Sequence, residues 1–289
     1  YLAVNVWGGN WDWPWTNWWA GRDRDPATTT GFKFYNWDYE NTMGNNRGRA
    51  PLHATTLDQN FTGNRNAGQA HTNLLPNEEY RMLFADRVHK FFFNDGVLTP
   101  DSLIARYQAM ADQVERSIVG ESARWGDQHH GTPLTLADWI AERDWILNTY
   151  LPARSEIVLD ELKSYDLYPN TVAPSFVEQH GGQVAEGFEL TISAPVGTIY
   201  YTLDGSDPRE IGGGIRSAAV PYSGMPLEIT SAVTVRARAL NGDEWSALNE
   251  ADFSVAPPAD HSNRRITEIN YNPHDANPVP GLGELDVDN

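Results

Sequence analysis

The spacing of apolar residues changes abruptly near residue 170. Before that point apolar residues recur at intervals of three and four, which is typical of amphipathic helices. After it they alternate with polar residues in short runs bounded by Gly, Asp and Pro, which is typical of strands. The change predicts a multidomain α+β protein: a mostly helical part over residues 1–170, an all-β, Ig-like antiparallel sandwich over 171–256, and a linker with an incomplete further domain over 257–289.

Charge and cysteine content exclude several classes of protein. The chain of 289 residues has 39 acidic and 21 basic side chains, a net charge of −18. This charge repels phosphate backbones and anionic lipids, so neither nucleic acid nor a membrane surface is an expected partner. No apolar run approaches the roughly 18 residues of a membrane span. Because Cys is absent, disulfide scaffolds, thiolate nucleophiles and Cys-ligated metals are excluded.

Start and stop signals place the helices. Asn77 is expected to cap a helix that ends at residues 94–96, and Thr99 to cap a second one. A third is expected from Thr135, with a break at Pro152 before the last. The second helix is expected to turn these residues inward: Leu103, Ile104, Tyr107, Met110, Ala111 and Val114.

The sandwich is predicted from three period-two runs at 190–193, 198–203 and 233–238. In the second run Ile199, Tyr201 and Leu203 are expected to face the core, and the Asp204-Gly205 pair to make a hairpin turn. Turn geometry explains Asp204 and Asp207 more simply than calcium binding, although carboxylates at this spacing are compatible with calcium.

The chemically informative stretch lies near the N-terminus. Asp12 and Asn17 are five residues apart in a loop, and Asp38 follows a strand predicted over 32–37, with residues 18–20 as the partner strand of a hairpin. Protein kinases use this layout: one Asp accepts the proton of the attacking hydroxyl, while an Asn oxygen and a second Asp hold Mg²⁺. Taken as a pattern alone, the spacing favours turn and capping roles for Asp12 and Asn17.

The amino-acid sequence of this segment resembles that of a known family. Residues 5–14 (NVWGGNWDWP) and 34–40 (FYNWDYE) closely resemble the CotH family of spore-coat-type atypical kinases, and three downstream segments agree. These are 84–90 (FADRVHK), 94–100 (NDGVLTP) and 121–127 (ESARWGD).

The resemblance covers about residues 1–170 and implies a kinase-like C-terminal lobe that uses ATP and Mg²⁺ to phosphorylate Ser or Thr hydroxyls. By this resemblance Asp12 is the catalytic aspartate, and Asn17 and Asp38 are the metal ligands. The family's N-terminal lobe, with its nucleotide-binding lysine, does not lie within these residues. The fragment alone is therefore expected to be inactive, and kinase activity to belong to the full-length protein.

Other polar residues carry two interpretations each. Glu40 is either a further Mg²⁺ ligand or a solvated strand end, and His129-His130 is a metal pair only if a third ligand joins it. Residues 124–127 are expected to pack a loop against the lobe through an Arg–Asp pair and a buried Trp125. The long loop over 41–73 lies where a kinase keeps its substrate-facing segment.

The β region carries two further resemblances. Residues 197–208 (GTIYYTLDGSDP), 221–224 and 233–239 closely resemble the C-terminal domain of chitobiase-type hexosaminidases, where the module is an accessory sandwich without catalytic residues. Residues 266–273 (ITEINYNP) resemble the opening strand of a bacterial lamin-tail domain.

We therefore predict a fragment of an exported bacterial CotH-like kinase, extracellular or at the cell surface, that acts on Ser or Thr of surface proteins. The alternative is a non-catalytic adhesin that binds cell-wall glycan. Eleven Trp are present, seven of them within the first 37 residues, and such rings can stack on sugars. Geometry separates the two hypotheses. Convergence of Asp12, Asn17 and Asp38 on one place favours the kinase, whereas coplanar exposed Trp rings favour glycan binding.

Overall fold

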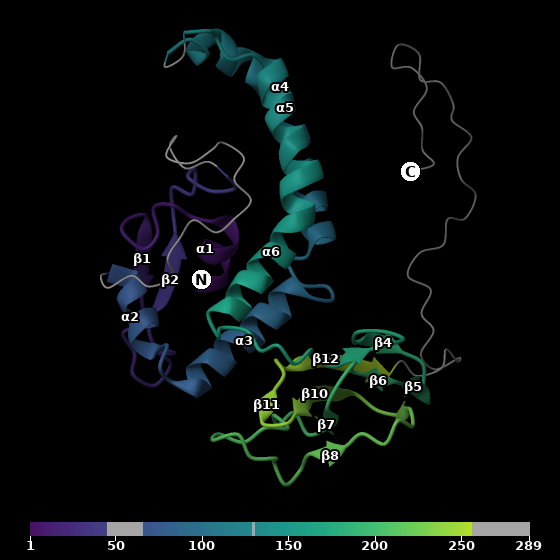
Figure 1. Cartoon of the computed structure of the whole chain (residues 1–289). Coiled ribbons are helices and arrows are strands. Elements are labelled where there is room, and N and C mark those ends of the chain that lie inside the picture. The colour runs from purple at the N-terminus through teal and green to yellow at the C-terminus, as the bar shows by residue number, and fades with distance from the viewer. Residues whose placement is uncertain (45–65, 129–130, 256–289) are drawn as a thin grey trace, which may run out of the picture.

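The computed structural model describes residues 1–44, 66–128 and 131–255 and shows a helical part beside a β part (Figure 1), which confirms the α+β class. The predicted linker and lamin-tail strand lie outside these residues, as does His129-His130. The helices are α1 (Leu2–Gly8), α2 (Asn66–Leu74), α3 (Glu78–Phe92), α4 (Pro100–Trp125), α5 (Leu136–Trp145) and α6 (Leu151–Ser164), with a π-helical segment, Ile146–Tyr150, between the last two. Within the described ranges, no helix is sufficiently long and apolar to span a bilayer.

A single apolar core joins α1, α3 and α6. Val88 of α3 and Val158 and Leu162 of α6 are completely buried in it. Val6 and Trp7, from α1, belong to the same cluster. The end of α1 is thus fixed by burial of apolar surface, and the loop that follows it starts from a rigid base.

Helix starts agree with the sequence signals. The Asn77 side chain accepts a hydrogen bond from the Tyr80 backbone N–H at 3.1 Å, and α4 begins after Thr99 with Pro100 in its first turn. Pro152, in contrast, does not break the chain's helical course. It lies in the first turn of α6, where a missing N–H costs little, and the π-helical segment leads directly into it.

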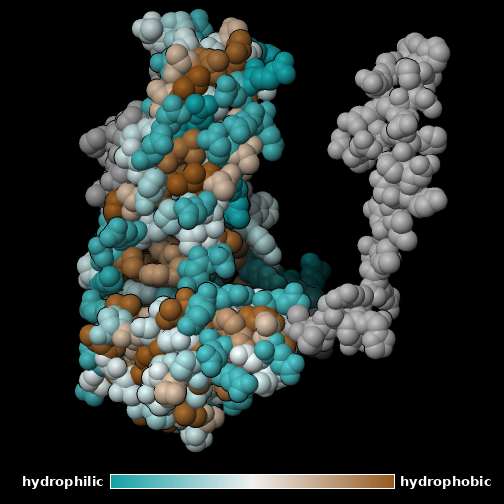
Figure 2. Space-filling view, turned by 90° about the vertical axis from the view of Figure 1, so that its right-hand side faces the viewer, coloured by the Kyte–Doolittle hydropathy of each residue, from teal (hydrophilic) through white to brown (hydrophobic). Residues whose placement is uncertain are grey.

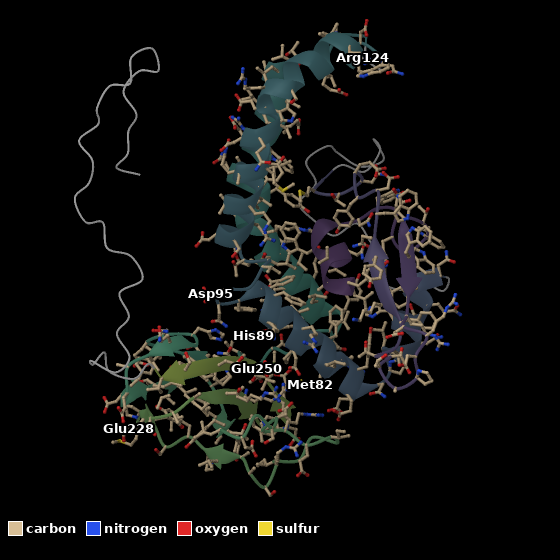
Figure 3. All side chains as sticks on the ribbon, turned by 180° about the vertical axis from the view of Figure 1, so that it is seen from behind. Met82, His89, Asp95, Arg124, Glu228 and Glu250 are labelled. Atoms are coloured by element: carbon tan, nitrogen blue, oxygen red, sulfur yellow. The ribbon has the colours of Figure 1, made fainter. Side chains whose placement is uncertain are left out.

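The distal half of α4 extends away from the core and runs beside α5 (Figure 1). Met110 and Val114, expected to face inward, are 63% and 45% exposed, so this expectation was wrong, whereas Ala111 is buried. Trp125 was also expected to be buried. It lies half exposed at the far end of α4, with the Arg124 guanidinium 4.8 Å from the centre of its ring. The labelled Arg124 marks this end of the helix (Figure 3). Figure 2 shows hydrophobic and hydrophilic residues interspersed along the surface of this helical extension.

The β part contains a six-stranded sheet in the order β4-β12-β10-β7-β8, with β11 paired to β10, and two two-stranded sheets, β3-β6 and β5-β9. Every pairing is antiparallel except β4 with β12. The strands are β3 (Ser175–Phe176), β4 (Gly182–Val184), β5 (Phe188–Leu190), β6 (Ile192–Ser193), β7 (Thr198–Thr202), β8 (Val220–Pro221), β9 (Leu227–Ile229), β10 (Val233–Asn241), β11 (Glu244–Trp245) and β12 (Asn249–Val255). The apolar core of the β part includes Leu190, Ile192 and Val235.

Three local expectations for the β part were wrong. The run 190–193 divides into β5 and β6, which pair with different strands, and Leu203 is 47% exposed. The Asp204-Gly205 pair closes no hairpin, because β7 pairs next with β8 at residues 220–221. Asp204 Oδ1 instead accepts the backbone N–H of Ser206 at 2.9 Å, which is the expected turn role.

Helix α3 is the element of the helical core that lies against the β part, as the labelled Met82, His89 and Glu250 indicate (Figure 3). Two buried arginines of the β part reach it. Arg238 pairs with Asp86, and Arg209 pairs with Glu78 and Glu79 at 3.0 and 2.7 Å. The two parts therefore share a polar, charge-paired junction. The predicted boundaries at residues 170 and 256 stay predictions.

Candidate active site

The β1–β2 hairpin brings two candidate residues together. Strands β1 (Trp18–Gly21) and β2 (Lys33–Asn36) pair antiparallel with Trp18 opposite Asn36. This pairing confirms the hairpin predicted for residues 18–20 and 32–37. Asn17 precedes the first strand and Asp38 follows the second, so both lie at the same end of the hairpin. The backbone N–H of Trp37 donates to the Asn17 carbonyl at 3.2 Å and extends the pairing to this end.

The third candidate, Asp12, lies in the loop that leaves α1. Helix α1 ends at Gly8 and is capped by Gly9, whose φ of 58° is a left-handed C-terminal conformation that favours glycine. The buried Arg154 of α6 donates to the carbonyls of Trp7 and Val6 at 2.7 and 3.2 Å. A guanidinium is well placed there, because the last carbonyls of a helix lack intrahelical donors and carry partial negative charge.

Asp12, Asn17 and Asp38 converge. Asn17 Nδ2 lies 3.2 Å from Asp12 Oδ2, 3.1 Å from the Asp38 carbonyl and 3.5 Å from Asp38 Oδ2. Asp12 and Asn17 are buried, at 7% and 8% exposed, while Asp38 faces solvent. One amide group thus stands between two carboxylates, one of them held inside the protein and the other at the surface.

The backbone at this place is unusual. Asn17 and Asp38 have φ angles of 59° and 52°, in the left-handed region. Asn and Asp tolerate this region better than other residues with a Cβ, because their short polar side chains can bond to the local backbone. Left-handed non-glycine residues cluster at functional sites, and here both belong to the predicted metal pair.

The donor set suits a hard cation. Asp38 offers a carboxylate and Asn17 an amide oxygen, and Mg²⁺ in phosphoryl-transfer sites is commonly held by one or two carboxylates with substrate phosphates. No group of three or more His, Asp or Glu side chains capable of holding a metal occurs in the described part of the chain, so a site here would need such outside oxygens. Asn17 Oδ1 now accepts from the Thr16 hydroxyl at 3.2 Å, and a half-turn of the amide would direct it toward the carboxylates.

Glu40 lies beside the same group. It is exposed, and its Oε1 accepts a hydrogen bond from Asn41 Nδ2 at 2.8 Å. Asn41 Nδ2 also lies 2.6 Å from Asp12 Oδ2. Sequence reasoning placed Asn41 only at the start of a long loop and missed this contact. The available signal was its position directly after the Asp38–Glu40 motif.

The seven N-terminal tryptophans include a buried set and an exposed set, with Trp11 and Trp18 of intermediate exposure. Trp7 and Trp13 are buried at 3% and 2%, whereas Trp15, Trp19 and Trp37 are 52–66% exposed. Trp19 lies opposite Tyr35 across the hairpin. The buried set supports the loop that carries Asp12. The exposed set leaves aromatic surface near Asp12 and Asp38.

Polar residues of the 84–90 segment have structural contacts. His89 Nδ1 lies 2.8 Å from the Tyr168 hydroxyl, and Asp86 pairs with Arg238. Asp207 pairs with the same arginine, so its partner in the structure is a guanidinium. Of the loop predicted over 41–73, residues 41–44 and 66–73 are described. Residues 66–73 belong to helix α2, so the prediction of a loop was wrong for that stretch.

Comparison with protein families defines the class as a CotH domain followed by a β domain. The family described as CotH kinase protein matches residues 1–155, and the family described as Fn3 associated matches residues 188–248. The chain belongs to the CotH kinase protein family. Neither a curated protein nor a solved structure matches it. The predicted CotH domain and β domain are thereby confirmed, while the chitobiase-type and lamin-tail resemblances stay predictions.

Proposed function

We propose that the full-length protein transfers the γ-phosphate of ATP to Ser or Thr hydroxyls of protein acceptors, with Mg²⁺ as cofactor. The observation that supports this is the convergence of Asp12, Asn17 and Asp38 within hydrogen-bond distance at the end of the hairpin. Membership in the CotH family is consistent with it. Export and a place at the cell surface belong to the same proposal.

Each residue then has a defined task. Asp12 accepts the proton of the acceptor hydroxyl while that oxygen forms the new bond to the γ-phosphorus and the bond to ADP breaks. Asn17 and Asp38 would hold the cation through their side-chain oxygens. Mg²⁺ bound there would neutralise the negative charge of the phosphates. Burial of Asp12 fixes its direction, and the exposure of Asp38 leaves that side open to a nucleotide.

The test is transfer from γ-labelled ATP to a generic Ser/Thr acceptor protein and to the chain itself, using the full-length protein. Asp12→Asn and Asp38→Asn preserve shape and remove charge, and Asp101→Asn, an exposed residue of α4, is the matched control. We expect the control to match wild type and the two site variants to lose roughly 100-fold or more. Equal transfer by all four proteins would overturn the proposal.

A second candidate function is glycan binding, which the exposed Trp15, Trp19 and Trp37 favour. Its test is sedimentation with purified cell-wall polysaccharide, comparing wild type with Trp19→Ala. Co-sedimentation that Trp19→Ala abolishes, together with no phosphate transfer, would replace the kinase proposal with this one.

A further inference from the structure

Two side-chain amides donate hydrogen bonds to the same carboxylate oxygen of Asp12. Asn17 Nδ2 lies 3.2 Å from Oδ2, and Asn41 Nδ2 lies closer, at 2.6 Å. Asn41 is 3% exposed, so its side chain lies in the interior beside a buried carboxylate. A charged acceptor roughly doubles the strength of a hydrogen bond, and the shorter contact is to Asn41.

The backbone holds Asn41 against the loop of Asp12. Trp11, the residue before Asp12, donates its backbone N–H to the Asn41 carbonyl at 2.9 Å. Two residues further, Met43 N–H donates to the Gly8 carbonyl at 2.9 Å, and the Tyr39 hydroxyl donates to the Val4 carbonyl at 2.5 Å. Residues 39–43 are thus fastened to α1 and to the start of its loop on both sides of Asn41.

The amide of Asn41 uses both of its N–H groups on carboxylates. An amide nitrogen has two donors, and Asn41 Nδ2 lies 2.6 Å from Asp12 Oδ2 and 2.8 Å from Glu40 Oε1. The result is an alternating series of acid and amide: Asp38, Asn17, Asp12, Asn41 and Glu40. The Asn41 amide separates the Asp12 and Glu40 carboxylates, which would otherwise repel one another, and this contact does not depend on which way the Asn17 amide is turned.

We propose that Asn41 is a positioning residue for phosphoryl transfer: its amide fixes the rotamer of the Asp12 carboxylate and shields it from Glu40. This inference rests on the proposed function of Asp12. It requires a hydrogen-bond donor at position 41, not merely a side chain of the right volume. An aspartate there matches the shape of asparagine but places a third negative charge between Asp12 and Glu40.

The test compares Asn41→Ala, Asn41→Asp and Asn41→Gln in the full-length protein, with Asn148→Ala, at an exposed position in the π-helical segment, as the control. The readouts are kcat, the KM values for ATP and acceptor, and Tm. We expect kcat of Asn41→Ala to fall roughly 10- to 100-fold with KM nearly unchanged, because a misdirected base slows chemistry and leaves binding intact. Asn41→Asp should fall further, and Asn41→Gln, which keeps the donor, should exceed Asn41→Ala.

The ranking separates positioning from packing. A packing role predicts that Asn41→Asp, the isosteric variant, retains more activity than Asn41→Ala, and this order would overturn the inference. If Asn41→Asp shows no unfolding transition, the comparison of Asn41→Gln with Asn41→Ala decides. A kcat of Asn41→Gln no higher than that of Asn41→Ala would then contradict the inference. If Asp12→Asn abolishes transfer while Asn41→Ala keeps wild-type kcat, only this inference fails. If Asp12→Asn is as active as wild type, the proposed function itself fails.

Discussion

Arg238 of β10 and Asp86 of α3 form a bidentate ion pair, with Nη1 2.8 Å from Oδ1 and Nη2 2.7 Å from Oδ2. The same guanidinium pairs with Asp207 of the β part, at 2.6 Å from Nη2 to Oδ2. Burial opposes ionisation of Asp207, but the hydrogen bonds and charge of Arg238 outweigh it and lower the pKa of that carboxyl. One arginine, 1% exposed, therefore joins carboxylates from both parts of the chain.

Replacing this arginine should destabilise the whole protein. Arg238→Met keeps the apolar stem and leaves two carboxylates without their partner, so we expect the free energy of unfolding to fall by about 3 kcal/mol or more. Lys163→Ala, which removes an exposed ion pair with Asp160, should cost less than about 1 kcal/mol. Urea unfolding measures both changes, and equal losses would contradict the role given to the junction.

Two buried histidines should make stability depend on pH. Burial lowers the pKa of His71 to about 4, and burial with the nearby charges of His180 and Arg238 lowers that of His89 to about 4. Both are neutral in the folded protein, whereas the unfolded chain binds their protons near pH 6.5. Stability from this source is therefore complete above about pH 6.5 and is lost as pH falls toward 4.

The slope of that loss is measurable. Each histidine contributes up to about 1.4 kcal/mol per pH unit within the window. His71→Phe should remove the contribution of His71 to this slope, because phenylalanine can pack beside Tyr80 and Phe84 and does not titrate. Chemical denaturation at several pH values between 4 and 7 gives the slopes, and identical slopes for wild type and variant would refute the assignment.

Close contact between Gly8 and Tyr39 links α1 to the Asp38 side of the candidate site. A Cβ at Gly8 would clash with the Tyr39 hydroxyl oxygen. Gly8→Ala should therefore displace Tyr39, the neighbour of Asp38, and cost about 1–3 kcal/mol of stability together with transfer activity.

Removing the hydroxyl should relieve this clash. We expect Gly8→Ala with Tyr39→Phe to be more stable and more active than Gly8→Ala alone, although Tyr39→Phe by itself loses the hydrogen bond to the Val4 carbonyl. Thermal unfolding and transfer rates of the four proteins complete the cycle. Strict additivity of the two substitutions would show that the contact carries no energy.

Features that depend on nearby residues were predictable. The Asn77 cap and the start of α4 arise from side chains within a few positions, and both agree with the structure. The β1–β2 hairpin also agrees, because it pairs two strands that follow one another along the chain. The convergence of Asn17 and Asp38 follows from the hairpin, because both residues lie at its one end.

Features set by distant packing were not predictable from local pattern. Met110 and Val114 follow the helical period, yet the core does not reach that half of α4. Arg238 and Asp86 are separated by 152 positions, and Asn41 and Asp12 by 29. No local rule relates residues at such separations, so the junction and the second amide on Asp12 required the structure.

The proposal that Asp12 is the base and Asp38 a cation ligand is tested most directly by the Mg²⁺ dependence of phosphate transfer. If Asp38 holds the cation, Asp38→Asn should need a much higher Mg²⁺ concentration for half-maximal rate. If Asp12 is the base, Asp12→Asn should keep the wild-type Mg²⁺ midpoint and lose rate at saturation. Unshifted midpoints and wild-type rates in both variants would contradict the account, as would a shifted midpoint in Asp12→Asn alone.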